Sequence, residues 1–380
     1  MQHDYNQEAL ELHKKYHGKI ETVSKVKLET REDLSRAYTP GVAEVCREIA
    51  KDPSLAREYT LKRNTVAIIS DGSAILGLGN FGPLSAIPVM EGKAAILKSF
   101  AGVDAFPICL DTQDTEEIIK VVKQIAPVFG AVNLEDISAP RCFEIEERLR
   151  KELPIPVMHD DQWGTATVVL AGLMNALKVT DREDNKSIKI VVNGVGSAGV
   201  AISRLLLSSG FTAITFCDSK GIIHEGRDDL TKEKKELITT STATPREGVL
   251  ADAVIGVDVC VGVSKAGALT EEMVKTMNKD AIVFALANPI PEIMPDVAKS
   301  AGVAVIATGR SDFPNQLNNS LIFPGLFKGV LDNIQQFDIM MFTRAAYALA
   351  SHVKNPTKDM ILPTMFDKDL VDVIATSVIG

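Results

Sequence analysis

Two pairs of adjacent acids follow apolar runs that are typical of buried strands. Glu135 and Asp136 end the segment AVNLED, and Asp160 and Asp161 end PVMHDD. Neighbouring side chains point to opposite faces within a strand, but they can converge where the chain turns at the strand end. Both pairs, aimed at one cleft, would offer the oxygen ligands that suit Mg²⁺ or Mn²⁺. Taken alone, either pair is equally consistent with solvated loop acids or helix caps.

One lysine lies on an apolar stripe of a predicted helix. In PVMEGKAAILKSFAG, Lys93 shares a helical face with Met90, Leu97 and Phe100. Burial favours the neutral amine, which is the form that a general base needs, and a nearby carboxylate such as Asp160 could tune it. The alternative is a lysine that extends along the apolar surface and keeps its charge in water.

A tyrosine precedes another predicted helix, VAEVCREIA. Thr39 can cap this helix with Pro40 in its first turn, so Tyr38 would lie at the mouth of the helix N-terminus. By itself this position fits a packing residue better than an acid.

The motif G-x-G-x-x-G occurs twice, in ILGLGNFGP at 75–83 and in NGVGSAGV at 193–200. The second copy follows a clean strand and opens a helix, whose free N–H groups and dipole favour a pyrophosphate. The first copy is followed by Pro83 and Pro88, so we expect no uninterrupted helix there and interpret it as a structural or substrate-side loop. The predicted dinucleotide-binding residues are Gly194, Gly196, Ser197, Ala198, Gly199 and Asp218.

Asp218 bears on the choice of cofactor. It ends the next strand, about 20 residues after the glycines, where a carboxylate accepts both ribose hydroxyls and repels a 2′-phosphate. Lys220 and Arg227 lie nearby in the sequence and could soften that repulsion. The sequence therefore favours NAD, with NADP as the alternative.

The elements that would position these residues form two α/β units. From about residue 187 to 310, apolar β-branched runs ending in Gly, Asp, Asn or Ser alternate with helical segments, which predicts a Rossmann-like, doubly wound parallel sheet. The preceding residues contain four further strand candidates, TVAIIS, DAFPICL, AVNLEDI and IPVMHDD. We expect a substrate and metal domain at 1–160, a dinucleotide domain at 161–320, and a helical tail at 321–380 that packs on the first domain.

Composition narrows the class of protein. The net charge of −9, with both signs interspersed, argues against a nucleic-acid partner. No apolar run reaches the ~18 residues of a membrane span, and the N-terminal segment resembles an amphipathic helix rather than a secretory signal or a transit peptide. Five cysteines, far apart and odd in number, favour the reducing cytoplasm.

Taken together, these segments resemble the malic enzyme family in its compact bacterial form. The matching segments, in the order of the family, are SRAYTPGVAEVCREI, ILGLGNFGPLSAIPVMEGKAAILK, VNLEDI, HDDQWGTA, NGVGSAGVAI, DSKGI, ALANPIPEI and TGRSDFPNQLNNSLIFPG. They cover nearly the whole chain, and their joint occurrence is far more specific than any one of them.

The resemblance implies a reaction and a set of roles. The reaction is oxidation and decarboxylation of L-malate to pyruvate with reduction of NAD, and the assembly is a homodimer. The implied roles are Tyr38 as general acid, Lys93 as general base with Asp160 as its tuning partner, Glu135, Asp136 and Asp161 as ligands of Mg²⁺ or Mn²⁺, and Asn288, Asn319 and, less clearly, Asn318 as groups that orient malate and the nicotinamide.

The chain also departs from the family pattern. Larger members carry an arginine in a GERILG-like segment where this chain reads GSAILG at 72–77, so Ser73 or backbone N–H groups would hold the malate carboxylate. Trp163 stands where bacterial relatives often have histidine. Two rival functions remain: conversion of malate to lactate with NAD retained, and a catalytically silent, dinucleotide-binding regulatory module.

Overall fold

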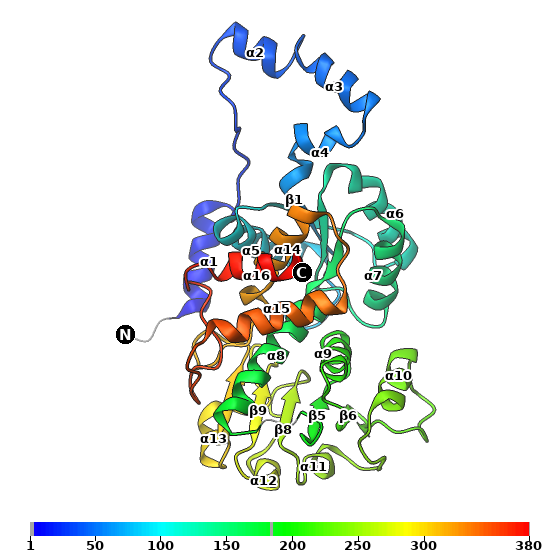
Figure 1. Ribbon diagram of the computed structural model, residues 1–380, viewed down its shortest axis with the longest axis vertical. Coiled ribbons are helices and arrows are strands. Elements are labelled where there is room, and N and C mark those ends of the chain that lie inside the picture. The colour runs from blue at the N-terminus through cyan, green and yellow to red at the C-terminus, as the bar shows by residue number, and fades with distance from the viewer. Residues whose placement is uncertain (1–3, 183–184, 380) are drawn as a thin grey trace.

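Two parallel sheets organise the chain in the computed structural model, which describes residues 4–182 and 185–379 (Figure 1). The first sheet has the order β2-β1-β3-β4, and all of its strand pairs are parallel. Its strands are β1 (Thr65–Ser70), β2 (Asp104–Cys109), β3 (Ala131–Leu134) and β4 (Val157–His159), and the helices between them are α5 (Pro83–Ala101), α6 (Thr115–Ile125) and α7 (Arg141–Glu152). All four strands predicted for this unit are confirmed.

The second sheet has the order β10-β9-β8-β5-β6-β7, and only the short β6–β7 pair is antiparallel. Its strands are β5 (Ile190–Asn193), β6 (Ile214–Asp218), β7 (Gly221–Ile222), β8 (Val259–Gly262), β9 (Ile282–Ala285) and β10 (Val305–Thr308). Its helices are α9 (Ser197–Ser208), α10 (Lys232–Thr240), α11 (Leu250–Ala253), α12 (Glu271–Lys275) and α13 (Pro295–Ser300). The strand order reverses between β5 and β8, which is where a doubly wound sheet opens a ligand crevice. The predicted fold class is confirmed.

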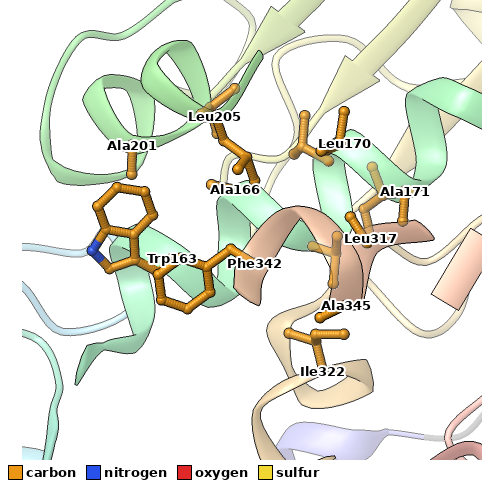
Figure 2. Packing of buried hydrophobic residues seen from close by; sticks show 14 of the residues in the cluster. Trp163, Ala166, Leu170, Ala171, Ala201, Leu205, Leu317, Ile322, Phe342 and Ala345 are labelled. Carbon is orange, nitrogen blue, oxygen red and sulfur yellow. The ribbon is translucent and has the colours of Figure 1, made fainter. Parts of the chain in front are cut away.

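The helix α8 (Asp160–Val179) passes between the two sheets and is buried along most of its length. It packs against α9 and against α15 (Ile339–His352) (Figure 2). The ring of Trp163 stacks on Phe342 with centroids 4.8 Å apart, and its Nε1 donates to Glu146 Oε2 at 3.1 Å. The indole therefore fills the space between α8 and α15 and satisfies a buried acid, which accounts for tryptophan at this position.

The structure bears on two of the predicted domain assignments, the boundary at residue 160 and the packing of the tail. The boundary after residue 160 falls on the first turn of α8, which belongs to the core between the sheets. In the tail, α14 (Phe323–Asn333) packs on α5, while α15 reaches α8 and α9, and α16 (Leu370–Ile379) packs on α14 and α15. The tail therefore contacts both domains rather than the first alone.

The first glycine motif is followed by a continuous helix, contrary to the prediction. Gly82 is the N-cap of α5, Pro83 occupies the first turn, and the helix continues through Pro88. A proline removes one hydrogen bond to the carbonyl four residues earlier, here that of Leu84. Leu84 is 81% exposed in the first turn, where water can satisfy its carbonyl.

An arm, defined here as residues 27–60, projects from the first domain between the predicted N-terminal helix α1 (Tyr5–Tyr16) and β1. It contains α2 (Arg31–Ala37), α3 (Val42–Lys51) and α4 (Leu55–Tyr59), and none of these helices has a buried residue. Figure 1 shows α2 and α3 at the top of the view, clear of both sheets. In the described part of the chain, no helix has the length and apolar character needed to cross a bilayer.

Candidate active site

A cavity of about 700 Å³ lies at the carboxyl ends of both sheets. The first domain contributes the loop after β1, the face of α5 that carries Lys93, and the acids after β3, while α8 contributes Asp161. The second domain contributes Ser197 at the start of α9 and Asn288 after β9. Members of both sets of predicted site residues therefore face one space.

Lys93 is held among acids on the buried face of α5. Its Nζ forms an ion pair with Asp160 Oδ2, lies 3.0 Å from Glu135 Oε1 and donates to Asn319 Oδ1 at 3.2 Å. The ring of Phe323 lies below it, with its centroid 4.4 Å from Nζ. Burial alone lowers the pKa of Lys93, but the attraction of Asp160 and Glu135 outweighs it and raises that pKa above the usual value. The amine is therefore an ammonium ion unless these carboxylates are neutralised.

Three carboxylates beside Lys93 form a potential metal site. One oxygen each from Glu135, Asp136 and Asp161 lies within 4.8 Å of the others. The adjacent acids converge because Asp136 has φ 54°, a left-handed conformation that turns the chain directly after β3. Its backbone N–H donates to Asp161 Oδ2 at 2.8 Å, which joins the end of β3 to the start of α8.

The electrostatics of this cluster fit a bound cation. Burial and neighbouring acids raise the pKa of Asp136 to about 9, and burial raises the pKa of Glu135 to about 7 against the opposing effect of Lys93. Asp136 Oδ2 is buried without a hydrogen-bond partner. Concentrated negative charge with an unsatisfied oxygen ligand is what a divalent ion would compensate.

Asp160 is fully buried and pairs with Lys93. A Cβ at residue 164 would lie 1.9 Å from Asp160 Oδ1, so the glycine in HDDQWGTA makes room for this carboxylate on α8. The predicted proximity of Asp160 and Lys93 is present in the structure. The role of Asp160 as a tuning group stays a prediction.

On the second domain, the second glycine motif forms a three-residue turn from β5 into α9. A Cβ at Gly199 would lie 1.8 Å from the carbonyl oxygen of Gly194, whereas a Cβ at Gly196 would meet nothing within 4 Å. Gly199 thus permits close packing within the protein, and Gly196 leaves open space above the helix N-terminus. Ser197 and Ala198 line the cavity. This geometry fits a dinucleotide pyrophosphate.

Asp218 lies at the end of β6 and is partly neutralised by two cations. Arg227 donates to both carboxylate oxygens at 2.9 Å, and Lys234 Nζ donates at 2.7 Å. Although burial opposes the effect, these bonds lower the pKa of Asp218 to about 2. The side chain of Lys220 pairs with Asp229 instead, so Lys234 supplies the second cation near Asp218.

Three predicted asparagines line the cavity. Asn288 follows β9, and Asn319 contacts Lys93. Asn318 is engaged locally, because its Oδ1 accepts from the backbone of Ser320 at 2.9 Å and its Nδ2 donates to the Gly309 carbonyl at 3.4 Å.

Several predicted site residues do not line the cavity: Asp160, Asp218 and the glycines at 194, 196 and 199 stand behind its wall or beside it, and Ser73 and Tyr38 lie away from the lysine–carboxylate cluster. Ser73 is absent from the described cavity lining, because its hydroxyl donates to Asp71 Oδ1 at 2.5 Å and accepts from Arg141 at 3.0 Å behind the loop. Its hydroxyl is thus engaged within the protein in this conformation, and its contact with malate stays a prediction. Tyr38 is 66% exposed on the arm and does not line the cavity of its own chain.

Sequence reasoning missed Lys265, Thr165 and Phe323, all of which line the cavity. Lys265 follows β8, so the rule that ligands lie beyond the carboxyl ends of parallel strands could have singled it out. Phe323 comes from the tail, and no local pattern in the sequence would bring it to Lys93.

The cavity joins a lysine surrounded by carboxylates to the crevice of a dinucleotide-binding sheet. This combination is typical of a nicotinamide-dependent oxidoreductase that uses a divalent metal. The chain matches the family model of the malic enzyme N-terminal domain over residues 17–150 and that of the malic enzyme NAD-binding domain over residues 163–379. The chain therefore belongs to the malic enzyme family.

Individual relatives agree over nearly the full length. The chain is 52% identical to a bifunctional malic/malolactic enzyme of Bacillus subtilis, covering 98% of this chain and 92% of that protein. It is 53% identical to an NAD-dependent malic enzyme of Geobacillus stearothermophilus, covering 95% and 76%. The crystal structure of an NAD-dependent malic enzyme from Thermotoga maritima is 46% identical, covers 98% of this chain and 99% of that chain, and superposes with a TM-score of 0.95.

Proposed function

We propose that this protein oxidises and decarboxylates L-malate to pyruvate and CO₂ with reduction of NAD, in a reaction that depends on Mg²⁺ or Mn²⁺. The observation that carries the proposal is the single cavity that holds Lys93, the three clustered carboxylates and the N-terminus of α9. Glu135, Asp136 and Asp161 would hold the metal, and the turn at 194–199 with Asp218 would hold the dinucleotide. When bound, the nicotinamide accepts a hydride from C2 of malate, and the metal polarises the oxygen on C2.

Lys93 is the proposed acceptor of the proton of the C2 hydroxyl. Its Nζ contacts Asp160 and Glu135, so its proton affinity depends on how much of their charge is neutralised. Asn319 accepts from the same nitrogen and limits the directions in which the lone pair can point. Asn288 and Asn319 offer amides at the cavity wall that can orient the carboxylates of malate.

Decarboxylation leaves an enolate that must gain a proton at C3. C3 gains one proton for each proton that the C2 hydroxyl loses, so the overall reaction releases none. A proton donor close to Lys93 can protonate C3 and then recover its proton from the ammonium of Lys93. Tyr38 is the proposed donor at C3, as its phenol can give a proton and take one back.

The test is to mix the protein with L-malate and Mn²⁺, supply NAD or NADP in parallel, and assay reduced cofactor and pyruvate together. The expected result is equimolar appearance of both products, loss of both on adding EDTA, and faster turnover with NAD. Oxaloacetate without pyruvate would contradict the decarboxylating role. Silence with both cofactors, in folded protein, would favour a regulatory module.

A second candidate is conversion of malate to lactate with NAD retained, which is favoured by the relative named as a bifunctional malic/malolactic enzyme. Reduced cofactor would then stay bound and lactate would accumulate. Assay of lactate beside pyruvate separates the two reactions in one experiment.

The setting of this reaction is also part of the proposal. We propose that the protein is a cytoplasmic homodimer, which light scattering and cell fractionation would test. The five cysteines are free thiols, as expected in a reducing compartment.

A further inference from the structure

Glu292 is a buried acid that the proposed reaction leaves without a role. It lies in the loop that follows β9, and only 1% of it is exposed. In the described part of the chain, no lysine, arginine or histidine forms an ion pair with it. Burial raises the pKa of Glu292, and hydrogen bonds from the backbone oppose that rise. Because a buried carboxylate without a cation is costly, the hydrogen bonds that it accepts indicate what it does.

The carboxylate of Glu292 bridges two loops. Its Oε1 accepts from the backbone N–H of Ser264 at 2.7 Å and from the Ser264 hydroxyl at 3.3 Å. Its Oε2 accepts from the backbone N–H of Ala287 at 3.0 Å. Ser264 follows β8 and Ala287 follows β9. One side chain therefore holds both loops close to the ends of their strands.

A third strand joins this network. Asn193, the last residue of β5, donates from Nδ2 to the Ser264 hydroxyl at 2.8 Å, so the hydroxyl gives its own proton to Glu292. Gly262, the last residue of β8, makes room for the acid, because a Cβ there would lie 2.6 Å from Glu292 Cδ. The strands β5, β8 and β9 are neighbours in the second sheet. Their carboxyl ends are therefore tied together through one buried acid.

The two bridged loops form a wall of the cavity. Ser264 lines the cavity from the first loop, and Ala287 and Asn288 line it from the second. The side chain of Asn288 lies against the residue that follows β10, since a Cβ at Gly309 would be 3.0 Å from Asn288 Nδ2. Glu292 is itself absent from the described lining. A change at Glu292 can therefore reach a ligand in the cavity only by moving the loops.

The proposed dinucleotide site assigns the nicotinamide half of the cofactor to this wall. The pyrophosphate would lie at the turn after β5, and Asp218 at the end of β6 would hold the adenosine ribose. In the sheet, β8 and β9 lie on the opposite side of β5 from β6. A dinucleotide that extends across the strand ends would therefore bring its nicotinamide to the loops after β8 and β9. These loops share their cavity with Lys93, the proposed base.

We propose that Glu292 is a positioning residue that holds the loops after β8 and β9 in the arrangement that binds the nicotinamide half of the cofactor. It acts through Ser264 and Ala287 and does not contact the cofactor. The proposal rests on the proposed function, which brings a nicotinamide into this cavity. Glutamine cannot take over this task, because both carboxylate oxygens face N–H donors and an amide offers only one acceptor oxygen.

Titration with two ligands tests the proposal without turnover. Fluorescence titration gives the dissociation constant of NADH, and calorimetry gives that of ADP, which carries the adenosine and two phosphates but no nicotinamide half. In Glu292→Gln we expect the dissociation constant of NADH to rise by about tenfold, as for one lost bond to a charged group, and that of ADP to change by less than about twofold. An equal loss for both ligands, or an unchanged affinity for NADH, would overturn the proposal.

Glu146→Gln is the matched control, because it makes the same change at another buried acid. Glu146 on α7 is 5% exposed and also accepts from three donors, namely the His159 backbone N–H, Gln162 Nε2 and Trp163 Nε1. We expect its melting temperature to fall as in Glu292→Gln, while its affinity for NADH stays that of the wild type. Weakened NADH binding in this control would trace the effect to general loss of stability and contradict a specific role of Glu292.

A second variant decides the question if Glu292→Gln does not fold. Asn193→Ala removes the donor that orients the Ser264 hydroxyl, and Asn193 does not line the described cavity. We expect a rise of about threefold in the dissociation constant of NADH and none for ADP, in keeping with the loss of one neutral hydrogen bond. Equal affinities of Asn193→Ala and the wild type for NADH would count against the bridge.

The titrations contain no malate, so they also separate this proposal from the proposed reaction. A selective loss of NADH affinity in Glu292→Gln, together with a wild type that does not oxidise malate, would support the role of Glu292 and overturn the proposed function. A wild type that does not bind NADH would overturn both.

Discussion

At the scale of the residue, Lys93 shows how charge and burial oppose each other. The desolvation of its amine favours the neutral form, while Asp160, Glu135 and Asp161 favour the ammonium ion, and the acids prevail. The protonation of Lys93 therefore depends on whatever neutralises the three clustered carboxylates. A divalent cation bound by Glu135, Asp136 and Asp161 would remove much of the stabilisation of the ammonium ion.

Replacing Lys93 by alanine should remove the base and leave the dinucleotide site in place. We expect malate-dependent reduction of NAD to fall by about 10²–10⁴-fold, the range usual for loss of a positioned base. NADH affinity, measured by fluorescence titration, should stay unchanged because the predicted dinucleotide-binding residues lie on the second domain, whereas Lys93 lies on α5. Near-normal malate oxidation by Lys93→Ala would show that another group takes the proton.

The pairing of Asp218 predicts how the cofactor preference can be shifted. Asp218→Ser removes the charge that repels a 2′-phosphate and leaves Arg227 and Lys234 without their shared partner. We expect the ratio of kcat/KM for NADP to that for NAD to rise by about tenfold or more, equivalent to ~1.4 kcal/mol. Asp229→Ser is the control, since Asp229 also pairs with Arg227 but is not the residue that ends β6. An unchanged ratio in Asp218→Ser would place the adenosine ribose elsewhere.

At the scale of the element, the two glycine motifs show what sequence patterns can decide. The short turn between β5 and α9 was predictable, because a clean strand, three glycines and a proline-free helix occur in immediate succession. The first motif also precedes a helix, α5. However, a twelve-residue loop, which contains this motif, separates α5 from β1. That difference in loop length, rather than the two prolines, is what distinguishes the motifs.

Two alanine substitutions separate the structural from the binding role of the second motif. Gly199→Ala puts a Cβ 1.8 Å from a backbone oxygen and should cost about 1–3 kcal/mol of stability as well as NAD affinity. Gly196→Ala meets no protein atom within 4 Å, so its melting temperature should change little while its NAD affinity falls. Calorimetry and NADH titration of both variants check this. Normal NAD binding by Gly196→Ala would mean that the pyrophosphate does not pass over that residue.

Other parts of the site were beyond the reach of sequence patterns. The convergence of Glu135 with Asp136 depends on a left-handed backbone at Asp136, a conformation that is uncommon for a non-glycine residue and that no local pattern in the sequence marks. Ser73 was a reasonable candidate for the malate carboxylate, but a competing network with Asp71 and Arg141 engages its hydroxyl. The placement of Tyr38 could not follow from its helix cap, because it depends on where the whole arm goes.

At the scale of the molecule, α8 connects the two domains through buried contacts with both. Its first residues, Asp160 and Asp161, belong to the lysine–carboxylate cluster, and its remaining turns pack on α9 and α15. The tail adds a second connection, since α14 contacts the first domain and α15 the second. We therefore expect the chain to unfold in one cooperative transition, so that a ligand bound at one end of α8 stabilises both sheets.

Binding of Mn²⁺ should raise the melting temperature of that single transition, and more strongly at pH 8 than at pH 6. Burial raises the pKa of Asp136 to about 9, far above its value of about 4 in an unfolded chain. The folded metal-free protein therefore holds a proton that the unfolded chain has lost, and its stability falls as the pH rises from about 4 towards 9. The metal displaces this proton, so its apparent affinity strengthens by up to about tenfold per pH unit over the same window.

The matched variants for this prediction are Asp136→Asn and Asp280→Asn. Both residues have a left-handed backbone, with φ 54° and 56°, which asparagine also adopts, but Asp280 is exposed and far from the carboxylate cluster in sequence. Calorimetry with and without Mn²⁺, reversed by EDTA, should show the pH-dependent shift in Asp280→Asn and in the wild type, and little of it in Asp136→Asn. An Mn²⁺ shift that is equal at both pH values would show that the ion binds without displacing a proton from Asp136. Two transitions, of which only one responds to Mn²⁺, would show that α8 does not couple the sheets.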